Sequence, residues 1–318
     1  MPPPPLSRRW PRRNRPLSER FLSVLIVNYN GGADLAECLK ALARQTMAKE
    51  RFEVIVLDNA STDGSAVGIQ NDWPALKWLH SERNLGFAEG NNRAAEFARG
   101  THWVLLNPDT IPDRYWLEEL DRAIEENPGC GIASKLVLLD NPGRLNSAGL
   151  FLLKDGRGAD RGFRQPDDGR YEAGGEVFAG CAAALAIPRL PTSEPLFDPR
   201  LFLYSEDLEL GWRRQRAGFR TVFSARAVVA HRVGGSGGNT GPTFAYHTER
   251  NRAILAVKYG DTRMALLAGP GLIARTARSI LRRDWDTAAA MIRATVDFIR
   301  MVPTVLRERR RLRRCESS

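Results

Sequence analysis

Residues 21–29 read FLSVLIVNY, a continuous apolar run that ends in polar side chains. A run so rich in β-branched residues is typical of a strand buried on both faces of a sheet. Two glycines follow at positions 31 and 32, and residues 33–45 then carry leucines at helical spacing. This strand–turn–helix unit predicts a parallel sheet with at least one covering helix.

The alternation of strands and helices continues over the next hundred residues. We expect strands at 52–57 (FEVIVL), 76–80 and 102–106 (HWVLL), and helices at 61–70, 87–99 and 114–126. Alternating strands and helices require crossover connections, which place helices on both faces of a parallel sheet. The sequence therefore predicts the α/β class, with a mostly parallel, doubly wound sheet.

The second half of the chain has a weaker pattern. Residues 140–176 are rich in Gly, Asp and Arg and predict loops with short antiparallel strands. We expect a buried strand-like run at 176–188, a helix at 207–217, and two short strands at 221–223 and 227–230. The glycine-rich stretch 231–242 predicts a mobile loop. From residue 250 onward the pattern is helical.

The composition excludes several classes of protein. Of the 318 residues, 43% are apolar, which is too many for a disordered chain. The four cysteines, at 38, 130, 181 and 315, form no CxxC pair, and the four histidines are scattered. A disulfide scaffold and a zinc finger are therefore excluded, and a reduced, cytoplasmic protein is expected.

The net charge of +10 comes from the two ends of the chain. Residues 1–20 carry +5 and residues 261–318 carry +7, whereas residues 21–260 sum to −2. A nucleic-acid-binding fold usually carries its basic surface on the folded body, so nucleic acid is not expected as a partner. Basic ends are more typical of contact with an anionic membrane surface, or of simple solvation.

The ends of the chain show no targeting or spanning segment. Residues 1–20 lack an apolar stretch and predict a disordered Pro/Arg-rich tail. The longest apolar run near the C-terminus, 264–274, is eleven residues long and contains Gly-Pro-Gly, which is too short and too broken to cross a bilayer.

Polar clusters stand where each of the first four strands ends, at residues 28–30, 58–63, 81–84 and 107–109. Each cluster alone could simply cap a helix. Because parallel strands bring their carboxyl ends to one crevice, four clusters together indicate a ligand site. The chain has neither GxGxxG after the first strand nor GxxxxGK[ST], so a dinucleotide oxidoreductase and a P-loop NTPase are not favoured.

Five segments and one histidine resemble the family 2 glycosyltransferases of the GT-A fold, in order and spacing. The segments are VLIVNYNGG, EVIVLDNASTDGS, NLGFAEGNN, VLLNPDT and FDPRLFLYSEDLELGWRR, and His231 follows them. The resemblance covers about residues 21–255 and is strongest to bacterial rhamnosyltransferase-like members. It implies a GT-A domain over 21–260, with a nucleotide-sugar half at 21–130 and an acceptor half at 131–260. Residues 261–318 would form a basic helical extension.

The resemblance implies a set of residues at the nucleotide-sugar site: Asn28, Asn30, Asp58, Asp63, Asn84, Gly86, Asn91 and Asn107. Asp58 would accept a hydrogen bond from the pyrimidine base, because a carboxylate suits a ring N–H donor. Asn28 and Asn30 would hold the nucleoside, while Asp63 could equally cap a helix. The segment containing Asn84 and Gly86 would close over the base and ribose.

The stretch 107–109 (NPD) matches the DxD metal motif of the family, although Asn107 stands at its first position. The resemblance implies that Asp109 and His231 bind Mg²⁺ or Mn²⁺. Such a cation needs hard oxygen ligands and neutralises the charge that builds on a leaving diphosphate.

Glu206 and Asp207 match the acidic pair of the family, whose aspartate is the general base in an inverting transfer. Glu206 would place the acceptor or its loop; alternatively, both carboxylates only complement a helix dipole. Trp212 and Arg213 would line the acceptor site, or Trp212 would belong to the core. Arg250 would reach the diphosphate, or lie on the surface at a helix start.

These features together predict an inverting, metal-dependent glycosyltransferase on the cytoplasmic face of the membrane. The donor implied by resemblance is dTDP-rhamnose, with UDP-linked N-acetylglucosamine, galactose or galactofuranose as alternatives and GDP-mannose left open. The acceptor would be a hydroxyl of a lipid-linked or cell-surface glycan. Two other classes are kept as alternatives: a non-catalytic nucleotide-sugar-binding protein and a nucleic-acid-binding protein.

The basic C-terminal helices leave two alternatives open. Arginines at 275, 278, 282, 283 and 293 alternate with apolar residues, as in helices that lie on anionic lipid. The other interpretation is a solvated face of helices that pack on the catalytic domain. The oligomeric state is not predicted.

Overall fold

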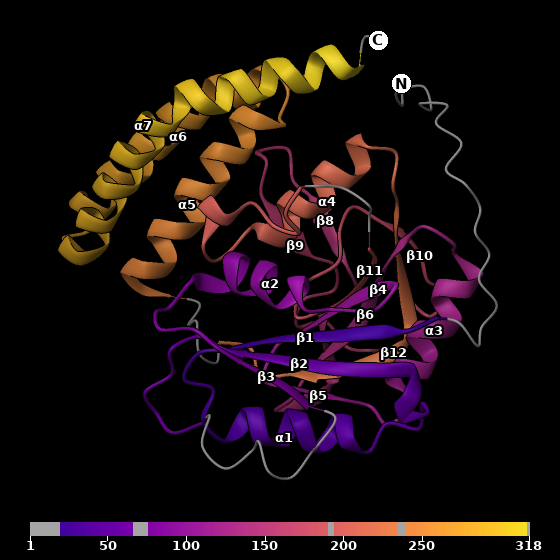
Figure 1. The fold of residues 1–318 in the computed structure, drawn as a ribbon. Helices are drawn as coiled ribbons and strands as arrows, with labels where there is room; N and C mark the ends of the chain where they lie inside the picture. Colours follow the sequence, from indigo (N-terminus) through magenta and orange to yellow (C-terminus); the bar gives the residue numbers. More distant parts are fainter. Residues whose placement is uncertain (1–19, 66–75, 190–193, 235–239, 317–318) are drawn as a thin grey trace.

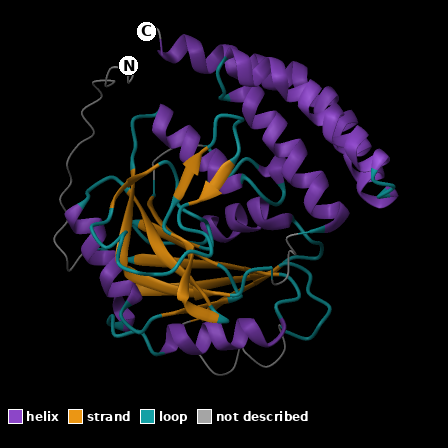
Figure 2. Ribbon diagram, turned by 180° about the vertical axis from the view of Figure 1, so that it is seen from behind, coloured by secondary structure: helices purple, strands orange, loops and turns teal. Residues whose placement is uncertain are grey.

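A computed structural model describes residues 20–65, 76–189, 194–234 and 240–316. A central sheet has helices on both of its faces, and the three C-terminal helices pack together beside it (Figure 1). Seen from behind, the strands of the large sheet form a twisted layer, and two further strands stand apart from it (Figure 2). The predicted α/β class and mostly parallel sheet are confirmed.

The first half of the chain builds the parallel part of the sheet. Its strands are β1 (Leu22–Asn28), β2 (Phe52–Asp58), β3 (Leu76–His80) and β4 (His102–Leu106). Its helices are α1 (Gly32–Ala43), the short η2 (Lys49–Arg51), α2 (Gly86–Glu96) and α3 (Trp116–Glu126). The strands are parallel in the order β4-β1-β2-β3.

The second half adds shorter strands to the same sheet. They are β5 (Thr110–Pro112), β6 (Gly131–Leu138), β7 (Asn141–Ser147), β10 (Gly175–Val177), β11 (Ala184–Pro188) and β12 (Thr221–His231). The order along the sheet is β10-β12-β6-β11-β4-β1-β2-β3, with β5 beside β12 and β7 beside β6. β12 runs parallel to β6, whereas β11 is antiparallel to β4 and β6. A separate hairpin joins β8 (Leu150–Leu152) to β9 (Gly158–Asp160).

The two faces of the sheet are buried under different helices. Side chains at alternate positions of β1, such as Val24 and Ile26, pack with Leu39 of α1 and Trp116 of α3. Leu25, which points to the opposite face, packs in a second core with the alanines of α2. This alternation is the period of two that a strand imposes. A strand buried on both faces must be apolar throughout, which explains the unbroken run at 21–29.

Three of the expected strands need correction. The two short strands expected at 221–223 and 227–230 are one strand, β12, with a bulge between Ser224 and Val228. The bulge turns Arg226 outward, where it pairs with Glu119 and Glu126 of α3. The run 176–188 is also not continuous, because β10 and β11 pair with different strands.

Three further predictions fall partly outside the described residues. The helix expected at 61–70 is not formed at 61–65, where the chain makes turns, and residues 66–70 are not described. The loop predicted to be mobile at 231–242 includes the undescribed residues 235–239, and residues 1–19 of the predicted tail are likewise outside the described part.

The short antiparallel strands predicted within 140–176 are confirmed as β7, β8, β9 and β10.

Three helices follow β12: α5 (Gly241–Lys258), α6 (Thr262–Leu281) and α7 (Trp285–Glu316). They share a core of their own, in which Leu272 of α6 and Phe298 of α7 pack on Ile254 of α5. The helix α6 continues through Gly269-Pro270-Gly271, although proline removes one helical hydrogen bond. Among the described residues, no helix has the length and apolar character that crossing a membrane requires.

The helix α4 (Glu206–Arg216) packs against the chain between β10 and β11, and one glycine makes this approach possible. A Cβ atom on Gly211 would lie 2.3 Å from the Cβ atom of Ala179 and 3.2 Å from the carbonyl oxygen of Phe178. Neither neighbour is a flexible side-chain end, so the helix itself would have to move.

We therefore predict that Gly211→Ala destabilises the protein by about 1–3 kcal/mol, because the clash outweighs the better helix propensity of alanine. The measurement is the free energy of unfolding from denaturant titration. Gly143→Ala is the matched control, since its Cβ atom would meet only Asn141 Oδ1, at 3.6 Å. Equal stability of both variants and the wild type would contradict the prediction.

Candidate active site at the carboxyl ends of the strands

Three adjacent strands end in polar residues that lie in register. Asn28 of β1 is paired with Asp58 of β2, and Asp58 is paired with His80 of β3. Asn28 Nδ2 donates to Asp58 Oδ1 at 3.2 Å, and His80 Nδ1 lies 3.2 Å from Asp58 Oδ2. Asp58 and Asn28 are buried, whereas His80 is mostly exposed. The structure thus brings Asn28 and Asp58 together and adds His80, which the sequence pattern indicated only as the end of a strand.

The loops after β1 and β2 are tied to each other by side-chain-to-backbone hydrogen bonds. Asn30 Oδ1 accepts from the Thr62 amide at 2.8 Å, and Asp63 Oδ2 accepts from the Gly32 amide at 2.8 Å. Gly32 is the first residue of α1, so Asp63 satisfies an amide at the start of that helix. Asn30 adopts a left-handed conformation (φ 53°) to make this turn. Both residues build the loop geometry at the edge of the crevice.

The segment 84–91 is held by the protein itself. Asn84 Oδ1 accepts from the Gly86 amide and from Asn59 Nδ2, at 2.8 and 3.0 Å. Asn91 donates to the Phe87 carbonyl within its own helix. The backbone at Gly86 does approach a neighbour closely, as predicted, but this neighbour is the side chain of Phe202. A Cβ atom on Gly86 would lie 2.5 Å from the Phe202 ring.

Asp109 and His231 meet at the end of β4 and of β12. His231 Nε2 lies 3.4 Å from Asp109 Oδ1, which is buried and has no hydrogen-bond partner. His231 Nδ1 lies 2.7 Å from Asn146 Oδ1. Because the amide oxygen can only accept, this contact places a proton on Nδ1, so that Nε2 of the neutral imidazole presents its lone pair to Asp109, whereas Nε2 of the imidazolium donates to it. Asn107 Oδ1 is also buried without a partner.

A pocket of about 380 Å³ opens beside Asp109. It is lined by Asn30 of the loop after β1, by Asp34 in the first turn of α1, by Pro108 and Asp109, and by Arg232. Arg232 Nε lies 3.1 Å from both carboxylate oxygens of Asp34, so one cation already stands in the pocket wall. The pocket therefore joins the ends of β1, β4 and β12, as expected of a ligand crevice in an open sheet.

The acidic pair lies at the first turn of α4. Burial raises the pKa of Glu206 to about 8, and neighbouring Asp207 acts in the same direction. Burial likewise raises the pKa of Asp207 to about 6, with a second contribution from the charge of Asp160. Amides of Leu208 and Ala182 donate to Asp207 and oppose the shift. Glu206 Oε2 is buried without a partner.

Asp160, which the sequence pattern did not single out, links the acidic pair to the histidine. It ends β9, its Oδ1 is buried without a partner, and burial raises its pKa. The charge of Asp160 raises the pKa of Asp207, and the charge of His231 lowers the pKa of Asp160. No local motif marks this residue, because the hairpin that carries it is brought to the site by long-range packing.

The turn before α4 is strained. Phe202, Tyr204 and Ser205 all have positive φ, between 64° and 67°, a conformation that costs a non-glycine residue about 1–3 kcal/mol. The turn persists because its carbonyls are held from α5: Asn251 Nδ2 donates to the carbonyls of Leu201, Leu203 and Tyr204, at 2.7–3.0 Å.

Arg250 holds the same turn together with Asn251, and we call these two residues the clamp. Arg250 is buried, lies in the interior of α5, and donates to the carbonyls of Arg200 and Leu201 and to Asn251 Oδ1. Its guanidinium is therefore directed at the chain before α4, which differs from both positions predicted for it. Trp212 lies in the core, stacked on Tyr259 with ring centroids 5.8 Å apart, which confirms the core alternative.

Residues 23–150 match the family described as glycosyl transferase family 2. The chain is 31% identical over 115 residues to the glycosyltransferase AglE of Haloferax volcanii, and the matched stretch covers 35% of this chain and 37% of that protein. It is 26% identical over 266 residues to the N-acetylglucosaminyl-diphospho-decaprenol L-rhamnosyltransferase of Mycobacterium tuberculosis, with 75% of this chain and 85% of that protein covered. The chain spans little more than a third of the first curated relatives it matches.

Solved structures share the fold. One is GalNAc-T7 with UDP, GalNAc and Mn²⁺, with a TM-score of 0.60, 17% identity, and coverage of 76% of this chain and 48% of that one. The predicted GT-A fold is confirmed, as is the resemblance to family 2 glycosyltransferases.

We predict that Asn251→Ala destabilises the protein by about 2–4 kcal/mol, because the carbonyls of Leu203 and Tyr204 in the strained turn lose their donor from α5 and the Leu201 carbonyl loses one of its donors. Thermal or denaturant unfolding measures the loss. Asn141→Ala, at an exposed position of β7, is the control and changes stability by less than about 0.5 kcal/mol. A loss of stability at position 251 no larger than in this control would refute the clamp.

Proposed function

Since residues 23–150 match the glycosyl transferase family 2 model, we propose that the protein transfers a sugar from a nucleoside-diphosphate donor to a hydroxyl group with inversion. The observation that carries the proposal is the contact of Asp109 and His231. A buried carboxylate oxygen without a hydrogen-bond partner faces Nε2 of an imidazole that is held at Nδ1, beside a pocket at the strand ends. Two lone pairs facing each other are unfavourable unless a proton or a metal cation lies between them, and a metal cation is the occupant that a diphosphate donor requires.

The donor set fits a divalent cation. A carboxylate oxygen and a neutral imidazole are ligands for Mg²⁺ or Mn²⁺, and the contact from Asn146 supports the required histidine tautomer. Within the described residues no group of three His, Cys, Asp or Glu side chains could hold a metal ion, so the remaining ligands would be donor phosphates and water. A bound cation would neutralise charge on the leaving diphosphate. GalNAc-T7, which shares the fold, was solved with Mn²⁺.

Asp58, Asn28 and His80 would bind the base of the donor nucleotide. The buried carboxylate of Asp58 accepts from Asn28 and lies against His80, and such an acceptor suits a ring N–H of thymine or uracil. Asn30 and Asp63 would shape the loop around the nucleoside, and Asn84, Gly86, Asn91 and Asn107 would complete the donor site. The likeness to a rhamnosyltransferase favours dTDP-rhamnose as donor, with UDP-linked sugars and GDP-mannose as alternatives.

Asp207 would act as the general base. It would remove the proton from the acceptor hydroxyl as that oxygen attacks the anomeric carbon, opposite the departing diphosphate. A base whose pKa is raised to about 6 remains ionised at neutral pH and accepts a proton more readily than a surface aspartate. Glu206, buried and unpartnered, would orient the acceptor.

The acceptor would be a lipid-linked or cell-surface glycan, reached from the cytoplasmic face of the membrane. The basic C-terminal helices support this assignment because they carry most of the excess charge of the chain. A non-catalytic sugar-nucleotide-binding protein is the alternative, and it predicts donor binding without transfer.

The first test is donor binding by calorimetry. We expect one nucleoside-diphosphate sugar among dTDP-rhamnose, the UDP-sugars and GDP-mannose to bind in the micromolar range with Mg²⁺ or Mn²⁺. Asp109→Ala should weaken metal-dependent binding by about tenfold or more, because the cation loses a charged ligand. Asp286→Ala, an exposed aspartate at the start of α7, is the control. Absence of binding to every donor, with and without metal, would overturn the proposal.

The second test is the pH dependence of transfer. A base must be ionised to act, so kcat/KM should fall as the pH drops through about 6, the pKa of Asp207. The fall of kcat/KM at low pH is the acidic limb of the pH profile. Asp160→Asn removes a negative neighbour and lowers the pKa of Asp207, so this variant should move the acidic limb to lower pH. Asp168→Asn, an exposed aspartate paired with Arg170, should leave the limb in place.

Asp207→Asn distinguishes an enzyme from a binding protein. It should reduce transfer by about 10²–10⁴-fold while donor binding is kept, because only proton removal is lost. An acidic limb that does not move in Asp160→Asn would contradict the influence of Asp160 on the base. Transfer that survives in Asp207→Asn would contradict the role of Asp207 as that base.

A further inference from the structure

The helices α6 and α7 expose an unusual amount of apolar surface. Among the described residues, ten of the fifteen large hydrophobic side chains that are exposed belong to these two helices. They are Leu266, Leu267, Ile273, Ile280, Leu281, Trp285, Ile292, Val296, Ile299 and Leu306. Single exposed apolar residues need no explanation, but a concentration of this kind marks an interaction surface. We call these ten residues the α6–α7 stripe.

On α7 these residues form one row. Trp285, Ile292, Val296, Ile299 and Leu306 follow one another at steps of seven, four, three and seven, which is one face of a helix. The residues of α7 that share a buried core with α5 lie on another face of the helix, and they are Met291, Phe298 and Val305. The row is therefore additional to the face that holds α7 to the protein.

On α6 the pattern is similar. Leu266, Ile273 and Ile280 recur at steps of seven and are exposed, whereas Ala268 and Leu272 are buried in the core shared with α5 and α7. Each helix thus buries one face in the shared core and leaves a second apolar face uncovered.

Arginines border the stripe on α7. Arg293, Arg300 and Arg307 are exposed, recur at steps of seven, and each directly follows a stripe residue along the chain. At the turn between the helices, Leu281 is 83% and Trp285 63% exposed, and two arginines at 282 and 283 stand between them. An apolar row beside a basic row is the arrangement of a helix that lies in the interface of an anionic bilayer.

We propose that the α6–α7 stripe and its arginines dock the protein on the interface of an anionic bilayer. The apolar side chains would enter the region between headgroups and acyl chains, and the arginines would contact lipid phosphates. This deepens the membrane part of the proposed function, although docking itself requires no sugar transfer.

Charge favours lipid over the other occupants of such a surface. Residues 261–318 carry +7, so a second copy of this chain would bring like charge against like charge. A nucleic acid would use the arginines but would leave the apolar stripe in water. An anionic bilayer interface satisfies both features at once.

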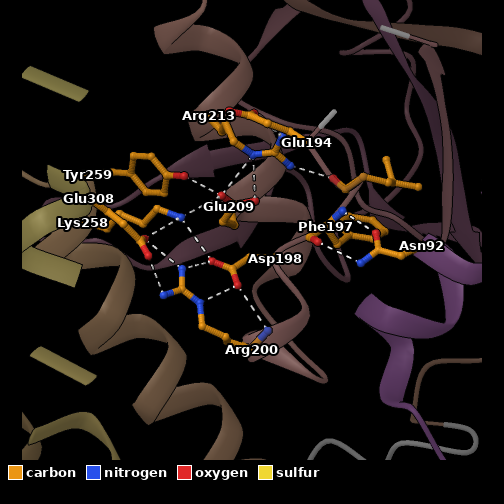
Figure 3. A network of polar contacts seen from close by, with 11 residues as sticks. Asn92, Glu194, Phe197, Asp198, Arg200, Glu209, Arg213, Lys258, Tyr259 and Glu308 are labelled. Atoms are coloured by element: carbon orange, nitrogen blue, oxygen red, sulfur yellow. Dashed lines mark hydrogen bonds and ion pairs between the residues drawn. The ribbon is translucent and has the colours of Figure 1, made fainter. Parts of the chain in front are cut away.

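Polar contacts fix this surface relative to the candidate site. Glu308 of α7 pairs with Arg200 at 2.7 Å and with Lys258 of α5 at 3.4 Å (Figure 3). Arg309, which is buried, donates to the carbonyls of Val257 and Gly260. The helix α7 is thus attached to the segment that leads into the strained turn before α4, and a docked protein would hold that turn at a set orientation to the bilayer.

The test is co-sedimentation of the full chain with vesicles of phosphatidylcholine alone and with about one third phosphatidylglycerol. We expect binding to the anionic vesicles that weakens with salt. The double variant Ile292→Glu/Ile299→Glu should lower this binding about tenfold or more, because two charges replace apolar anchors. Tyr115→Glu/Phe151→Glu is the matched control, since it makes the same change at exposed sites on the α/β body.

A second variant tests the arginines. Arg293→Gln/Arg300→Gln should weaken binding to anionic vesicles by about tenfold or more, and should change binding to neutral vesicles much less. Both positions are exposed, so folding is expected to be retained, and circular dichroism checks it.

Three results would overturn the proposal. The first is no binding of the wild type to either kind of vesicle. The second is binding of Ile292→Glu/Ile299→Glu and of Arg293→Gln/Arg300→Gln that equals the binding of the wild type, which would assign docking to the basic N-terminal segment. The third is a concentration-dependent dimer in sedimentation velocity that Ile292→Glu/Ile299→Glu abolishes, since a second copy would then cover the stripe. Donor calorimetry on the same samples separates these outcomes from failure of the transferase proposal.

Discussion

The turn at residues 201–205 depends on one buried asparagine. Three positive-φ residues with side chains cannot hold that conformation by themselves, and Asn251 satisfies three of their neighbouring carbonyls from α5. On its other side, the Phe202 carbonyl accepts from the amides of Phe87 and Ala88, at the first turn of α2. The turn therefore sits between two helices and carries the acidic pair directly after it. The place of that pair relative to the strand ends depends on this arrangement.

Strand register explains why the donor side of the site could be predicted in part. Parallel strands that end at the same level bring Asn28, Asp58 and His80 side by side without any further device. The apolar runs revealed where the strands end, and polar residues there were easy to select. The contacts of these residues were harder to predict. Asp63 and Asn84 accept hydrogen bonds from backbone amides of the loops, and the residue type alone does not reveal this.

The acceptor side was harder to predict because it is built from distant segments. Asp160 reaches the site on a hairpin without periodicity, and nothing near it in the chain distinguishes it from the surface aspartates around it. The position predicted for Arg250 was wrong because its burial depends on packing between α5 and a turn about fifty residues earlier. The bulge that joins two expected strands into β12 likewise belongs to a long-range pairing, that of β12 with β6. Local pattern located the helices and strands; tertiary contacts decided which side chains they bury.

The cluster of ions around Asp198 sets an order of events during synthesis. Burial alone raises the pKa of Asp198, but Arg200 and Lys258 lower it to about 2, so this aspartate folds as a paired charge. Arg200 also needs Glu308, which is 108 residues further along the chain. Chains emerge from the ribosome from the N-terminus onward and fold domain by domain. The strands of the sheet and the helices that cover it are thus synthesised before Glu308, the last partner of Arg200, and the segment before the strained turn can acquire its final set of contacts only after α7 has been made.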